Sequence, residues 1–174
     1  MVEIKVNGID GLIKKFNDLA KSTQDDVNAA LEDWSNRTAA DAKTLVSANS
    51  SDEGNLLRSI SPSHGNGYAK VVATARYAAY IEFGTRKFAS SYVSTLPSDW
   101  AAYAATFKGR AGGTFKEFLL SIMAWCKRKG IDEAAAYPIA RKIMIDGIKA
   151  RPFLYPSVNK NLPLLVQDIK AIFK

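Results

Sequence analysis

The fold is decided by residues 10–46, DGLIKKFNDLAKSTQDDVNAALEDWSNRTAADAKTLV. Apolar or small side chains recur along this stretch at steps of three and four residues: Leu12, Phe16, Leu19, Thr23, Val27, Leu31, Trp34, Thr38, Ala42 and Leu45. Such spacing puts one stripe on one face of an α-helix, and acids and amides fill the other face. We expect a long helix that braces a sheet or a neighbouring subunit. A break at residues 21–24, where the pattern is weakest, is the open alternative.

Short β-like segments flank the expected helix on both sides. Before it, residues 2–6 (VEIKV) alternate apolar and charged side chains, which is the period of a half-buried strand. After a polar loop at 47–55, residues 58–63 and 68–75 form two runs joined by HGNG. Asn-Gly is the strongest short hairpin signal, because both turn residues need a positive φ. We expect an N-terminal strand, followed after the helix by a hairpin with His64 in its turn.

The rest of the chain is predicted to be mainly helical. Residues 77–83 form two helical turns that Gly84 closes in the left-handed conformation. Residues 88–113 are rich in Ala, Ser and aromatic side chains and end in a basic loop at 108–113. Thr114 and Glu117 have the spacing of a capping box, so a helix is expected to start there and to close at Gly130.

The last part of the chain contains several prolines, which are expected to interrupt or restart its helices. A segment that starts at Asp132 is interrupted at Pro138, where the helix either kinks or restarts. Residues 151–156 (RPFLYP) are expected to form an extended connector because of their two prolines. Apolar side chains at helical spacing from Val158 to Ile172 predict a C-terminal helix, which a restart at Pro163 divides in the alternative interpretation.

These segments together predict an α+β fold: a small antiparallel sheet packed on a long N-terminal helix, with a helical insertion and a C-terminal helix. At 174 residues the chain fits one domain, or one domain with a sizeable insertion. We assign residues 1–87 and 150–174 to the core domain. Residues 88–149 are the basic helical insertion within the same domain.

The net charge of +7 is concentrated in the middle of the chain. Residues 1–85 carry 9 basic and 11 acidic side chains, residues 86–151 carry 12 and 5, and residues 152–174 carry 3 and 1. Such asymmetry points to an acidic partner surface or to nucleic acid. The candidate contacts with DNA or a partner are Lys108, Arg110, Lys127, Arg128 and Lys129.

The sequence offers little for catalysis, which needs several convergent titratable groups. His64 is the one histidine, and Cys126, in an apolar helical context, is the one cysteine. We therefore expect no enzyme and no catalytic, cofactor or metal site. No apolar run approaches the ~18 residues of a membrane span, so we expect no membrane contact. Glu82 lies between two apolar side chains, and it is expected to be partly buried and to pair with Arg76, Arg86 or Arg151.

Two blocks, YAAYIEFGTRKF at 77–88 and KARPFLYPSV at 149–158, resemble the two sequence signatures of a minor tail component family of long-tailed bacteriophages. Members of that family are usually called tail-completion or head–tail joining (neck) proteins. The positions that match the signatures are Tyr80, Glu82, Phe83, Gly84, Thr85, Arg151, Pro152 and Phe153. Our physical interpretation is that the two blocks meet, that Phe83 packs on Phe153, and that Arg151 pairs with Glu82.

The resemblance implies a virion structural protein without catalytic activity at the head-proximal end of the tail, acting as a ring of identical subunits. Its partners would be other copies of itself, other neck and tail proteins, and DNA that passes non-specifically through the lumen. It would be located in the virion and, during assembly, in the host bacterial cytoplasm. The long helix and the N-terminal strand are the surfaces we expect to assemble the ring.

The main alternative is a DNA-binding regulatory protein that uses the basic helical insertion. Two helical segments joined by KRKGI at 127–131 are superficially like a helix-turn-helix. Against this interpretation, Ala134–Ala136 and Pro138 stand where a recognition helix would place base-reading side chains. A third interpretation, a small hydrolase, would depend on Glu82 or His64.

Overall fold

The computed structural model describes residues 9–49, 54–107 and 114–173. Contacts within the chain divide it into two compact units. Unit 1 comprises Met1–Thr74 and Phe153–Lys174, and unit 2 comprises Ala75–Pro152. The described part is mostly helical with one two-stranded antiparallel sheet, as the predicted α+β class requires. The domain boundaries assigned from the sequence differ from these unit boundaries and stay a prediction.

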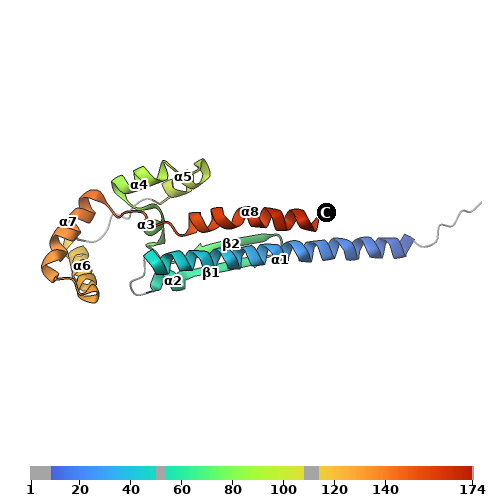
Figure 1. Ribbon diagram of the computed structural model, residues 1–174, viewed down its shortest axis with the longest axis horizontal. Coiled ribbons are helices and arrows are strands. Elements are labelled where there is room, and N and C mark those ends of the chain that lie inside the picture. Colours follow the sequence, from blue (N-terminus) through green and yellow to red (C-terminus); the bar gives the residue numbers. More distant parts are fainter. Residues whose placement is uncertain (1–8, 50–53, 108–113, 174) are drawn as a thin grey trace, which may run out of the picture. The chain divides into compact units, whose positions relative to one another are not determined.

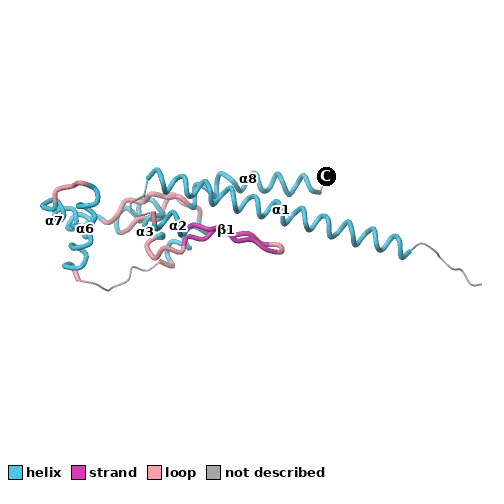
Figure 2. Tube along the Cα trace, turned by 90° about the horizontal axis from the view of Figure 1, so that it is seen from below, coloured by secondary structure: helices cyan, strands magenta, loops and turns pink. Residues whose placement is uncertain are grey.

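Unit 1 is built along one long helix, α1 (Ile9–Asn49), which is continuous through residues 21–24. Its 41 residues correspond to about 60 Å at 1.5 Å per residue. The predicted stripe is buried in the C-terminal half of α1, at Trp34, Thr38 and Ala42. Toward its N-terminus α1 continues past the ends of the other elements of unit 1 (Figures 1 and 2).

A short helix, α2 (Asn55–Ser59), leads into the hairpin that packs on α1. Strands β1 (Ile60–Gly65) and β2 (Tyr68–Ala73) pair from Ile60 opposite Ala73 to Gly65 opposite Tyr68. The loop is therefore Asn66-Gly67 alone, and the prediction that His64 lies in the turn is wrong: His64 lies in β1, opposite Ala69. Tertiary hydrogen bonds explain the tighter turn, because the Asn28 side chain of α1 accepts a 2.9 Å bond from the Gly67 N–H.

The turn itself differs from the expected conformation. Gly67 has a φ of 75°, but Asn66 is not at positive φ. A positive φ at the second central residue alone is the pattern of a type II turn, which requires glycine there.

The C-terminal helix, α8 (Leu154–Ile172), packs along α1 in unit 1. The structure corrects the expected extended connector and decides the open alternative at Pro163. Leu154–Pro156 is helical, not extended, because the first turn of a helix needs no N–H from proline. Pro163 lies inside α8, which continues through it without restarting.

All regular elements in the described residues of unit 2 are helices. Its elements are α3 (Ala78–Phe83), α4 (Arg86–Val93), α5 (Ser98–Ala105), α6 (Phe115–Lys129), the 3-10 turn η1 (Glu133–Ala135) and α7 (Ala136–Asp146). The capping box of α6 is confirmed: the Thr114 hydroxyl accepts a bond from the Glu117 N–H, and the Glu117 carboxylate accepts one from the Thr114 N–H. Gly130 closes α6 at a φ of 66°. Pro138 lies in the first turn of α7.

Two sequence-based predictions lie outside the described residues, namely the strand at 2–6 and the basic loop at 108–113 with Lys108 and Arg110. Among the described helices, none has the length and apolar character needed to cross a membrane.

Candidate interaction sites

The two signature blocks meet in unit 2 through backbone hydrogen bonds. The Thr85 N–H donates to the Ile148 carbonyl at 2.9 Å, and the Ile148 N–H donates to the Thr85 hydroxyl at 2.7 Å. Further along, the Arg151 N–H donates to the Ile81 carbonyl at 2.8 Å. These bonds tie the end of α3 to the segment after α7. We call this region the signature junction (residues 81–85 and 147–151).

Two glycines allow the close approach at the signature junction. Gly84 has a φ of 74°, and a Cβ there would lie 2.8 Å from the Ile148 carbonyl oxygen. Its ψ of −170° is extended, so the predicted left-handed helical stop is corrected to an extended glycine turn. Gly147, at a φ of 92°, faces it, and a Cβ there would overlap the Thr85 carbonyl. The sequence interpretation missed Gly147, although it lies between α7 and the second block.

The other signature residues are distributed over both units. Glu82 is buried, with 2% of its surface exposed, as expected for an acid between two apolar side chains. Arg151 is exposed and Pro152 is half-buried. Phe153 is buried in unit 1, where its carbonyl accepts a bond from the Ser157 hydroxyl. The contacts proposed from the sequence between Phe83 and Phe153, and between Glu82 and Arg151, stay predictions.

Phe83 instead has a set of aromatic neighbours that the sequence did not indicate. Within unit 2 its ring lies 6.4 Å from Trp100, 6.2 Å from Tyr103 and 5.9 Å from Phe107, measured between centroids. These distances are typical of tilted and edge-to-face aromatic pairs. Residues 88–107, which showed only an alanine-rich and aromatic texture, thus form α4 and α5 and pack against α3.

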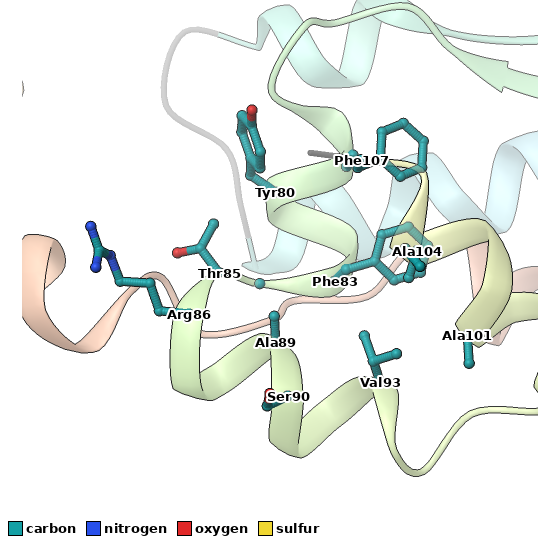
Figure 3. A pocket seen from close by; sticks show the side chains of 13 residues that line it. Tyr80, Phe83, Thr85, Arg86, Ala89, Ser90, Val93, Ala101, Ala104 and Phe107 are labelled. Atoms are coloured by element: carbon teal, nitrogen blue, oxygen red, sulfur yellow. The ribbon is translucent and has the colours of Figure 1, made fainter. Parts of the chain in front are cut away.

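An open pocket of about 500 Å³ lies between α3, α4 and α5 (Figure 3). Its apolar end is formed by Val93, Ala101, Ala104 and Phe107, and Figure 3 shows Thr85 and Arg86 on the other side, with the Arg86 side chain directed away from the apolar residues. The pocket exists because α5 presents the small side chains of Ala101, Ala104 and Ala105 to it. The helical spacing of these alanines is visible in the sequence.

Arg86 stands out in this pocket for two reasons. It has a φ of 53° and is the one non-glycine residue at positive φ in the described ranges. Such a conformation costs on the order of 1–3 kcal/mol and tends to occur at functional sites. Its exposed side chain makes no hydrogen bond or ion pair with any described residue.

The net positive charge of the chain lies in unit 2. Residues 75–152 carry 13 basic and 6 acidic side chains, a net charge of +7, whereas the residues of unit 1 carry equal numbers of both signs. Lys127, Arg128 and Lys129 are exposed in the last turn of α6, where cations interact favourably with the helix dipole. Lys87 pairs with Asp146 at 2.6 Å, and this contact lowers the pKa of the Asp146 carboxyl.

A polar seam joins α1 and α8 within unit 1. The buried Asn161 amide donates to the Asp41 carboxylate at 2.7 Å and to the Ser157 carbonyl at 2.9 Å. The hydrogen bond from Asn161, reinforced by Lys160 at 3.0 Å, lowers the pKa of Asp41. Further along, Arg37 bridges Asp33 and Asp168, each at 2.9 Å. The seam fixes the register of α8 on α1.

Residues 17–26 of α1 are mostly exposed. From Asn17 to Asp26 every described side chain except the half-buried Thr23 is exposed, and Leu19 has 63% of its surface exposed. Asp18, Asp25 and Asp26 outnumber the one base of this segment, Lys21. We call residues 17–26 the acidic arm.

The residues considered for catalysis are divided between the two units. His64 lies 3.6 Å from Glu32, and both side chains are exposed. Cys126 is fully buried, as expected for a packed small hydrophobe. Within the described ranges, no group of three or more His, Cys, Asp and Glu side chains is arranged to hold a metal ion.

Comparison with known families identifies one match. Residues 10–84 match the sequence model of the HK97-gp10-like family, described as "Bacteriophage HK97-gp10, putative tail-component". The match covers α1, the hairpin and α3, and it ends at Gly84 within the first signature block. It confirms the resemblance to a phage tail component family that the two blocks indicated. No curated protein and no solved structure matches the chain.

Proposed function

We propose that this chain is a virion structural protein without catalytic activity, which completes the head-proximal end of a phage tail and joins it to the head. The observation that carries the proposal is the match of residues 10–84 to a phage tail component family. The second signature block lies outside that match, and the hydrogen bond from its Arg151 N–H to the Ile81 carbonyl of the first block supports the assignment.

Ring assembly is the proposed mode of action. A helix gains most of its stability from packing of its apolar face, so an uncovered helical segment favours a partner. The acidic arm is such a segment, and it lies far along α1 from the buried half around Trp34 and Ala42. A head-to-tail contact between identical subunits closes a ring when its rotation divides a full turn.

The basic charge of unit 2 gives the ring two further proposed partners. Exposed Lys127, Arg128 and Lys129 would face DNA in the lumen or an acidic surface of a neighbouring neck or tail protein. The protein would then be found in the virion and, before assembly, in the host cytoplasm.

A phage that lacks this gene tests the proposed function. We expect separate DNA-filled heads and tails to accumulate, and plasmid-borne wild-type protein to restore infectious particles. Electron microscopy of lysates and plaque counts measure both. Joined, infectious particles formed without the protein would refute the role.

A further inference from the structure

The pocket of unit 2 combines features that define what can bind there. One end is apolar and lined by the small or aromatic side chains Ala101, Ala104 and Phe107. The other end presents Arg86, whose guanidinium has no partner among the described residues (Figure 3). A complementary ligand therefore carries an exposed apolar side chain in line with a carboxylate.

The acidic arm of α1 has this arrangement. Leu19 and Asp26 are seven residues apart, so they lie on the same helix face about 10 Å from each other. Both side chains are exposed. Gln24 and Asn28, which hydrogen-bond to the Asn66 side chain of the hairpin turn, lie on a different face.

The same face of α1 is already an interface further along. Asp33 and Arg37 continue the line of Leu19 and Asp26 at helical spacing, and Arg37 binds Asp168 of α8 at 2.9 Å. Asp41 contacts Asn161 and Arg37 contacts Asp168, so α1 and α8 run antiparallel, and α8 ends at Ile172, four residues after Asp168. The helix α1 continues past that end toward its own N-terminus, which is the direction of Asp26 and Leu19 (Figures 1 and 2). The arm is thus the uncovered continuation of an established helix-packing surface.

We propose that the pocket between α3, α4 and α5 receives the acidic arm of a second copy of this chain, with Leu19 at the apolar end and Asp26 at Arg86. The inference rests on the ring assembly proposed above and names its contact. Charge complementarity selects the occupant: the arm carries three acids and one base, and unit 2 carries the whole net charge of +7. Since arm and pocket are different surfaces, the contact is heterologous and propagates from copy to copy.

Disulfide trapping tests the geometry in the full chain. All variants carry Cys126→Ala, which removes the buried native thiol. A Leu19→Cys preparation is mixed with an Ala104→Cys preparation under mild oxidation, and we expect a cross-linked dimer in the mixture. The matched control replaces Leu19→Cys by Leu120→Cys, an equally apolar position on α6 with 55% of its surface exposed, and no such dimer is expected. Circular dichroism checks that each variant folds.

Charge reversal tests the pairing separately. Asp26→Lys and Arg86→Glu should each raise the concentration for half-assembly at least tenfold, and the double variant should return it to within about threefold of wild type. Asp25→Lys makes the same charge change on another face of the arm and should have a much smaller effect. Sedimentation velocity over a concentration series measures these values.

The outcomes separate this inference from the proposed function. The arm–pocket contact is overturned, and the ring is left standing, if the wild-type protein assembles but the Leu19→Cys and Ala104→Cys mixture forms no cross-linked dimer. It is also overturned if Asp25→Lys and Asp26→Lys raise the concentration for half-assembly equally. A variant that carries both Leu19→Cys and Ala104→Cys, and that cross-links within one chain while the mixture forms no dimer, shows that the arm occupies its own pocket and also overturns the contact. A protein that stays monomeric at all attainable concentrations overturns self-docking, whereas the gene-deletion phage tests the tail role independently.

Discussion

At the scale of single residues, the signature junction depends on two glycines that face each other across two chain segments. Gly84 and Gly147 are both buried at positive φ, and each has backbone atoms of the other segment where a Cβ would stand. The sequence indicated Gly84 because it follows a helical pattern. Gly147 could not be found in this way, because its role depends on a contact with Thr85, more than 60 residues earlier in the chain.

The first prediction at this scale concerns Gly147→Ala. The new methyl group would overlap the Thr85 carbonyl at a φ of 92°, so we expect a loss of about 2–4 kcal/mol of unfolding free energy. Gly130→Ala is the control: its φ is 66°, but nothing lies within 4 Å, and a loss of only ~1 kcal/mol is expected. Hydrogen exchange adds a local readout, because the Thr85 and Ile148 amides should lose protection in Gly147→Ala alone. Equal losses for both variants would contradict the steric argument.

At the scale of elements, the sequence predicted the helices and turns whose local sequence signals agree with their tertiary packing. The stripe of α1, the Asn-Gly hairpin and the capping box of α6 each combine a periodic pattern with a specific start or turn residue. Local signals failed where tertiary packing decides. α5 has only a weak apolar stripe, and its Trp100 and Tyr103 pack on the ring of Phe83. The prolines of α8 suggested an extended connector, but packing on α1 and the position of Pro156 in the first turn allow a helix.

The polar seam between α1 and α8 gives a pH dependence. Asn161 and Lys160 hold the pKa of Asp41 below its ordinary value of 3.8 in the folded state. A depressed folded-state pKa stabilises the fold above the unfolded pKa, and this stability is lost as pH falls from about 5 through the folded pKa. Asp41→Asn should therefore reduce the slope of unfolding free energy against pH in that range, by at most about 1.4 kcal/mol per pH unit.

Urea unfolding at pH values between 2 and 7 measures this slope. The exposed Asp99 of α5 supplies the control, since Asp99→Asn should leave the slope near that of wild type. Asp146, whose pKa the Lys87 contact also lowers, contributes to the acid dependence of wild type and of both variants alike. An unchanged slope in Asp41→Asn would show that the seam does not hold a charged carboxylate.

At the scale of the whole molecule, charge and apolar exposure are divided between the two units. Unit 2 carries the net charge of +7, and unit 1 carries the acidic arm, whose described side chains are exposed except for the half-buried Thr23. The sequence located the basic region from its charge count, because charge distribution along a chain needs no tertiary information. It could not locate the pocket, whose walls come from three helices. The net positive charge of unit 2 and the exposed acidic arm favour association between oppositely charged surfaces over recognition of a specific DNA sequence.

The last prediction distinguishes a DNA-lining ring from a DNA-binding regulator. We expect the protein to bind duplex DNA weakly, with affinity that falls about 40-fold between 50 and 200 mM salt if about three phosphates are contacted. Lys127→Gln combined with Arg128→Gln and Lys129→Gln should remove most of this binding. The control removes three charges from unit 1 instead, at Lys21, Lys43 and Lys70, and should retain it. Fluorescence anisotropy with duplexes of unrelated sequence measures the DNA affinity of the wild type and of both triple variants. Tight binding to one sequence that survives 200 mM salt would favour the regulator, because base readout, unlike phosphate contact, does not depend on released counterions.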